Sequence, residues 1–177
     1  MGETMVENTV FSSLTDSRKA FDMLAGATFE RSYPASEPQA DRLFVKLAHL
    51  EEVYPGFRNW YWGKVIDGFI DGSRRAFVAG GDQVTGIVIA KRTASERKLC
   101  TVWVDSRSGG RGVGAALMKD AMSWLATDKP LITVPAERIS EFQPLFKRWR
   151  FSLDHVADSM YRYGRREYVF NLKSNRN

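Results

Sequence analysis

Hydrophobic residues recur every three or four positions between residues 36 and 72, which is the period of an amphipathic helix. A first predicted helix is capped by Ser36, carries Pro38 in its first turn and ends at Pro55-Gly56. Its apolar face comprises Leu43, Leu47, Leu50 and Val53. A second helix ends at Gly72 and carries Trp60, Tyr61, Trp62, Val65, Ile66, Phe69 and Ile70. The pattern therefore predicts two consecutive helices.

Short β-type runs then replace the helical period. Three of them, at residues 76–79, 87–90 and 99–104, predict an antiparallel meander, and Gly80-Gly81-Asp82 is typical of a hairpin turn. Further strands are predicted at 28–33, 130–134, from Leu153 onward and at 167–172, with a helix within the run 142–151. The predicted order is β-α-α-β-β-β-α-β-α-β-β, a mixed α/β fold.

The segment from Val102 to Leu117 predicts a strand, a glycine-rich turn and a helix that opens at Gly112. Backbone N–H groups and the helix dipole favour an anion at such a helix start, and glycine lets a ligand approach the backbone closely. The turn therefore predicts a phosphate or pyrophosphate site for a nucleotide-like cofactor. Gly114 is followed by two alanines rather than by the Lys-Ser/Thr of a Walker loop, and the glycine spacing does not fit the dinucleotide fingerprint.

Together, the meander, the glycine turn and the strand–helix segment after it resemble the GNAT N-acetyltransferase superfamily. Gly112-Val113-Gly114 match the end of the family motif Arg/Gln-x-x-Gly-x-Gly/Ala, and residues 142–151 resemble the family's helix ending F-Y-x-x-x-G-F. The resemblance covers roughly residues 28–172. It implies a central, splayed, mostly antiparallel sheet, acetyl-CoA as the acyl donor, no metal, and transfer of an acetyl group to a primary amine.

The resemblance also implies which residues hold the donor. Backbone N–H groups of the third meander strand would polarise the thioester carbonyl, and the glycine turn would bind the pyrophosphate. Gly109 stands where the family has Arg or Gln, so Arg107 or Arg111 would supply the charge. The expected cofactor-binding residues are Val102, Trp103, Val104, Gly109, Gly110, Arg111, Gly112, Val113, Gly114 and Ala115.

The proton-transfer groups depart from the family pattern. Phe146 occupies the position of the family's acid tyrosine, beside a site expected to be wet, and the usual carboxylate on the third meander strand is absent. The candidate acids are Tyr161 and Tyr163. The candidate bases, acting through water, are Glu96, Glu51 and Glu52.

Other chemistry remains open at the reacting centre. Cys100 is either an acyl-enzyme nucleophile or a small buried residue. His49 and His155 receive no role, and no Cys/His spacing suggests zinc. The aromatic run at residues 60–62 is either a wall of the acceptor site or ordinary packing, because adjacent residues cannot all face the same way on a helix.

Two departures from the family motifs motivate an alternative function. The acid tyrosine is missing, and Gly109 stands where the family has Arg or Gln. The alternative is a non-catalytic module that binds acyl-CoA or a partner.

Chain length and composition indicate the number of domains and the cellular location. The 177 residues fit one domain, which we place at 27–177. Residues 1–26 form an N-terminal extension, with a short-helix pattern between Ser13 and Leu24. One cysteine, no signal-peptide pattern and no membrane-length apolar run lead us to expect a soluble cytoplasmic protein, monomeric or homodimeric.

The formal net charge of +5 resides entirely in residues 138–177. Tyr161-Arg162-Tyr163, followed by Arg165 and Arg166, places aromatic and basic side chains together, a pattern that can bind RNA. The acceptor is accordingly a small molecule, a protein amine or aminoacyl-tRNA. The other interpretation of this basic region is a solvated edge.

Overall fold

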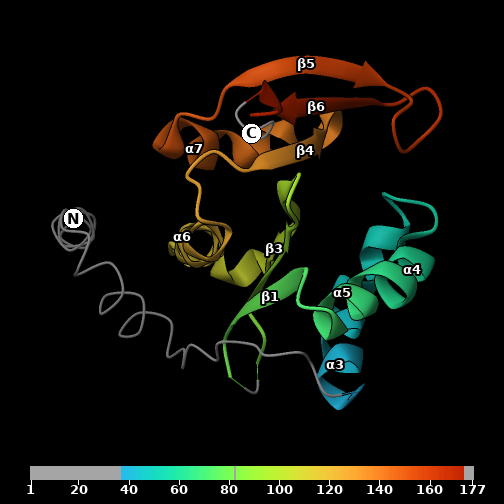
Figure 1. The fold of residues 1–177 in the computed structure, drawn as a ribbon. Coiled ribbons are helices and arrows are strands. Elements are labelled where there is room, and N and C mark those ends of the chain that lie inside the picture. Colours follow the sequence, from blue (N-terminus) through green and yellow to red (C-terminus); the bar gives the residue numbers. More distant parts are fainter. Residues whose placement is uncertain (1–36, 82, 174–177) are drawn as a thin grey trace, which may run out of the picture.

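The computed structural model describes residues 37–81 and 83–173 (Figure 1). Several expected features lie outside the described residues: the helix within 13–24, the first strand at 28–33, the Ser36 cap and the third residue of the hairpin turn. The other predicted helices and strands are present, in the predicted order.

The first helical region begins with α3 (Glu37–Leu47) and continues as a 3-10 turn, η1 (Ala48–Glu51). The second consists of α4 (Phe57–Trp60), a π-helical turn η2 (Tyr61–Val65) and α5 (Ile66–Ile70). Leu43, Leu47 and Leu50 are buried as predicted, whereas Val53 lies in a turn after η1 and is half-buried. The Glu51 carboxylate accepts hydrogen bonds from the N–H groups of Gly56 (3.1 Å) and Arg58 (2.7 Å), so it caps the second helical region.

Within the described residues, six strands form one sheet in the order β1-β2-β3-β4-β6-β5. Their bounds are β1 (Arg74–Ala79), β2 (Gly86–Arg92), β3 (Arg97–Val104), β4 (Leu131–Pro135), β5 (Leu153–Asp158) and β6 (Arg166–Phe170). The β1–β2–β3 meander is antiparallel as predicted, and β3–β4 is the parallel pair. That parallel pairing is confined to Lys98↔Leu131 and Leu99↔Ile132, after which the two strands diverge. The sheet is thus splayed at its centre.

Helices cover both faces of the meander (Figure 1). Ile87 and Ile89 of β2 pack in a cluster with α3–α5, whereas Val88 and Ala90 pack with α6 (Val113–Leu125) on the opposite face. A Cβ at Gly86 would lie 2.8 Å from the Leu117 side chain, so glycine there lets α6 approach β2 closely. α7 (Ile139–Trp149), preceded by a 3-10 turn η4 (Ala136–Arg138), packs beside the β4–β6–β5 part. Within residues 37–81 and 83–173, no helix has the length and apolar character needed to span a bilayer.

Candidate active site

A pocket of about 400 Å³ opens where β3 and β4 diverge. Cys100 and Val102 line it from β3, and Thr133 and Pro135 line it from β4. The register between β2 and β3 shifts at this level: Ala90 pairs with Leu99 and Ile89 with Thr101, which leaves Cys100 as the extra residue of a bulge. The bulge and the missing β4 partner together free part of the β3 backbone inside the pocket.

The helical regions form an aromatic wall of the same pocket. Tyr54, Phe57 and Trp60 line it. Tyr61 instead is fully buried and donates its hydroxyl to the Ala40 carbonyl at 2.9 Å, while Trp62 is 37% exposed against Phe44. The three aromatic neighbours thus point in different directions, as helical geometry requires, and Trp60 is the member that faces the pocket.

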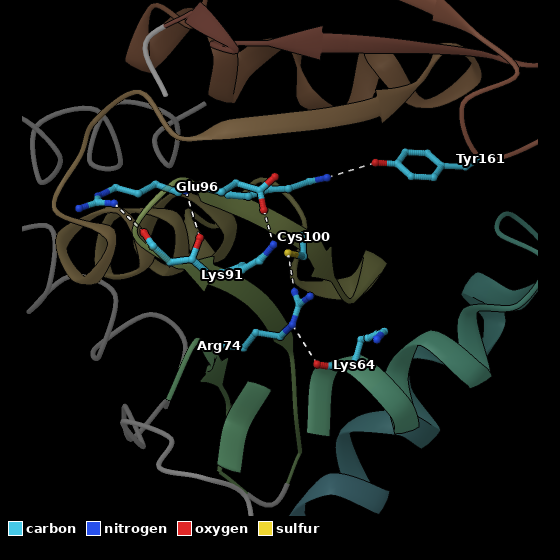
Figure 2. Close-up of polar contacts among 9 residues, drawn as sticks. Lys64, Arg74, Lys91, Glu96, Cys100 and Tyr161 are labelled. Atoms are coloured by element: carbon cyan, nitrogen blue, oxygen red, sulfur yellow. Dashed lines mark hydrogen bonds and ion pairs between the residues drawn. The ribbon is translucent and has the colours of Figure 1, made fainter. Parts of the chain in front are cut away.

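Polar side chains cover the meander side of the pocket (Figure 2). The Lys91 ammonium lies 2.5 Å from the Glu96 carboxylate. The Lys98 ammonium donates to the Tyr161 hydroxyl at 3.1 Å, and an Arg74 guanidinium N–H donates to the Cys100 sulfur at 3.2 Å. Burial lowers the pKa of Lys98, but nearby Tyr161 and Cys100 raise it more when they are ionised, so the pKa is raised overall.

The structure brings two of the three predicted catalytic residues together. Tyr161 and Glu96 both line the pocket, although they are far apart in the sequence. Tyr163 does not, because its side chain is 99% exposed. Glu51 and Glu52 also lie outside the lining, and the Glu51 carboxylate is occupied as a helix cap.

Phe146 corrects one sequence-based expectation. We expected this position to lie beside a wet site, but the side chain is 7% exposed and belongs to the core. Its ring centroid lies 4.2 Å from that of Phe170 and 5.4 Å from that of Phe151. The reason is that α7 packs this face onto β6, so the pocket meets α7 one turn earlier, at Phe142.

Burial raises the pKa of the Cys100 thiol, and the nearby Arg74 and Lys98 only partly offset this. A protonated thiol is a poor nucleophile. His49 and His155 are exposed and lie outside the pocket lining.

The glycine-rich turn has the geometry of a backbone anion site. Gly112 is the N-cap of α6 at φ +80°, and no side chain caps the helix there. Gly110 has φ +74°, and a Cβ on it would meet nothing within 4 Å. Both positions favour glycine, whereas Gly109 is extended at φ −62°. The turn therefore leaves open space over backbone N–H groups at a helix start.

Of the two arginines near this turn, Arg111 is the one free to meet an anion. Arg111 is exposed, whereas Arg107 is paired with Asp105 at 3.0 Å. Val113 is buried, and a Cβ on Gly114 would lie 3.3 Å from the Val104 side chain. Trp103 packs towards the α3–α5 cluster. Ala115 is half-buried on the first turn of α6. Arg111 is thus the better-placed of the two candidate arginines.

Sequence reasoning missed Tyr54, Arg74, Lys91, Lys98 and Arg138, all of which line the pocket. Lys98 could have been found, because it lies two positions before Cys100 on the same strand. The others come from different elements, and only the register of the sheet and the path of the loops bring them together.

Arg162, which the sequence placed in a basic region, is not simply a solvent-exposed cation. It pairs with Glu137, and its other guanidinium nitrogen lies 3.5 Å from Glu167, which is 0% exposed. The guanidinium also lies over the Tyr54 ring, 5.7 Å from the centroid. Burial, and then the Glu167 charge, raise the pKa of Tyr54. Part of the basic region therefore belongs to the framework behind the pocket.

Comparison with solved structures identifies the fold. The chain is similar to the PaiA N-acetyltransferase of Thermoplasma acidophilum in complex with coenzyme A (12% identity, TM-score 0.61, 81% of this chain and 96% of that one). It is also similar to Arabidopsis thaliana NAA60 in complex with a bisubstrate analogue (14%, 0.58, 81% and 95%). A third neighbour is a Desulfovibrio desulfuricans protein proposed to be a GNAT acetyltransferase (15%, 0.60, 81% and 96%).

No family model matches the sequence, and no curated protein matches it significantly. At these identities the structural likeness shows the fold. The chain has the GNAT acetyltransferase fold that the sequence resemblance predicted.

Proposed function

We propose that this protein is an acetyl-CoA-dependent N-acetyltransferase acting on a primary amine. The observation that carries the proposal is the pocket at the divergence of β3 and β4, on the strand that leads into the glycine-rich turn. One strand therefore connects the glycine-rich turn to a pocket lined by polar and aromatic groups. The neighbours bound to coenzyme A or to a bisubstrate analogue support the same assignment.

The glycine-rich turn is the proposed donor site. The space at Gly110 and the uncapped start of α6 at Gly112 would accept a pyrophosphate, and the charge of Arg111 complements it. Acetyl-CoA, when bound, supplies an activated thioester. Backbone groups of residues 102–104, beyond the last β3–β4 pair, would orient the acetyl group and polarise its carbonyl.

Two pocket residues take the proton-transfer roles in this proposal. Tyr161 is the acid that protonates the leaving thiolate, because its hydroxyl faces the pocket and accepts a hydrogen bond from Lys98. Glu96, at the edge of the pocket beside Lys91, receives the proton of the acceptor ammonium through water. Tyr163 takes no role, since its side chain is directed to solvent.

Two measurements, made one after the other, test the proposal. Acetyl-CoA should raise the melting temperature of the protein in a concentration-dependent way, because a ligand that binds the native state stabilises it. Free thiol should then appear when a panel of primary amines is added. No melting shift at millimolar acetyl-CoA would contradict the donor site. A shift without thiol release on any amine would favour the alternative, a module that binds acyl-CoA without catalysis.

A further inference from the structure

Three cationic side chains form a row across the meander on the pocket side. Arg74 of β1 is directly opposite Lys91 of β2, and Lys91 is directly opposite Lys98 of β3. Directly paired residues of antiparallel strands project to the same face, and all three line the pocket. Like charges in such positions destabilise a sheet, so this arrangement has an energetic cost that packing alone does not explain.

Carboxylates inside the pocket neutralise only part of this charge. Among the described lining residues the cations are Arg74, Lys91, Lys98 and Arg138, and the carboxylate is Glu96. Glu96 pairs with Lys91, and Arg138 is paired with Glu141 at 2.6 Å outside the lining. Two cationic groups, Arg74 and Lys98, are therefore left without an ion-pair partner in the part of the chain that the structure describes.

The hydrogen bonds and the ring contact of Arg74 are made to uncharged groups. A Cβ on Gly68 would lie 2.5 Å from the Arg74 stem, so glycine in α5 makes room for it. Its Nε donates to the Lys64 carbonyl at 3.0 Å, one terminal N–H donates to Cys100, and the Trp60 ring lies 5.7 Å from the guanidinium carbon (Figure 2). The second terminal nitrogen has no acceptor among the described residues.

Lys98 is similarly placed on the other side of Cys100. Its ammonium donates to the Tyr161 hydroxyl, a neutral partner. Asp71 is close enough to Arg74 for their charges to interact, but its carboxylate accepts a hydrogen bond from the Ser73 N–H at 2.7 Å and does not line the pocket. The region around Cys100 thus carries fixed positive charge with unused donors.

The donor's pyrophosphate does not account for this charge. The glycine-rich turn follows the C-terminal end of β3, whereas Lys98 lies at its start. Six residue steps along a strand separate Lys98 from Val104, about 20 Å. The cationic row therefore lies on the acceptor side of the reacting centre.

We propose that the acceptor of this protein is a small amine that also carries an oxyanion, a carboxylate or a phosphonate, which Arg74 and Lys98 bind. The inference rests on the proposed acetyl transfer and deepens it by naming the acceptor class. The guanidinium fork and the ammonium supply charge-assisted hydrogen bonds to the oxyanion. Polyamines and other polycations are disfavoured, because the same two groups repel them.

Matched pairs of amines test the proposal. Phenylalanine is compared with phenethylamine, and 2-aminoethylphosphonate with 3,3-dimethylbutylamine, an analogue of similar shape that lacks the oxyanion. Spermidine serves as the polycation. Isothermal titration calorimetry measures binding with and without saturating coenzyme A, and thiol release measures turnover. We expect the anionic member of at least one pair to bind about tenfold more tightly, and the two pairs show which oxyanion is preferred.

Substitutions test whether Arg74 and Lys98 cause the preference for amines that carry an oxyanion. Arg74→Gln and, independently, Lys98→Gln should each reduce it about tenfold, and the second variant keeps the test valid if the first fails to fold. Arg75→Gln is the matched control. Arg75 is the next residue of β1, is exposed on the other face and contacts Trp124.

Equal or tighter binding of the amines that lack an oxyanion, or tightest binding of spermidine, would overturn the inference. So would a preference unchanged in both variants. Thiol release only with amines that lack an oxyanion would refute this inference and leave acetyl transfer standing. Selective binding of anionic amines without thiol release would refute acetyl transfer and leave the anion site standing.

Discussion

At the scale of single residues, the chemistry of Cys100 separates two mechanisms. Its thiol pKa is raised, so the neutral form prevails near neutral pH and the thiolate accumulates only as pH rises well above it. We expect Cys100→Ala to retain acetyl transfer within about twofold, because direct attack by the amine needs no thiolate. Steady-state thiol release measures this. A large loss, together with an acetylated Cys100 peptide in the mass spectrum, would instead establish an acyl-enzyme.

Two tyrosines close in sequence provide a matched pair. Tyr161 reaches the pocket and Tyr163 does not, although only one residue lies between them. Tyr161→Phe should lower kcat about a hundredfold or more, since a positioned general acid typically contributes a factor of at least about 10². Tyr163→Phe should leave kcat unchanged. Similar rates in both variants would remove Tyr161 from the proton-transfer step.

At the scale of elements, Arg162 joins the loop after β5 to η4 and β6. Its guanidinium is the partner of Glu167, whose other carboxylate oxygen, Oε2, is buried without a hydrogen bond. Arg162→Ala leaves that carboxylate buried and unpaired, which should lower the free energy of unfolding by about 3 kcal/mol. The control Arg165→Ala removes an exposed side chain and should change it by less than about 0.5 kcal/mol. Urea denaturation measures both.

The pH dependence of this loss has a defined sign. Burial raises the pKa of Glu167, and Arg162 opposes that rise. Without Arg162 the pKa should rise further, so protonation relieves the unpaired charge as pH falls through it. The stability deficit of Arg162→Ala should therefore be larger at pH 7.5 than at pH 5. A deficit that grows towards acidic pH would show that Glu167 is not the group responsible.

Local patterns in the sequence predicted most of the elements but not how they meet. The helical period predicted the burial of Leu43, Leu47 and Leu50, and the glycine spacing predicted the turn at Gly112. Both were predictable because each pattern lies within a short stretch of sequence. Phe146 was misplaced because a family position fixes a residue's helix but not the contacts of its side chain. The Arg74–Lys91–Lys98 row depends on register between strands, which no local period encodes.

At the scale of the whole molecule, β3 organises both proposed sites. Its C-terminal end leads into the glycine-rich turn and α6, and its first half carries Lys98 and the Cys100 bulge (Figure 1). β4 pairs with it for two residues and then diverges, which opens the pocket between the two ends. This geometry lets a donor and an acceptor approach one reacting centre from different directions.

The affinity of acetyl-CoA for two glycine variants tests the account most directly. Gly110 and Gly164 have φ of +74° and +69°, and a Cβ on either meets nothing within 4 Å, so aspartate strains both positions alike. Isothermal titration calorimetry should show about a hundredfold weaker binding for Gly110→Asp, because its carboxylate repels the pyrophosphate, and unchanged binding for Gly164→Asp. Equal affinity in both variants and the parent protein would contradict the donor site.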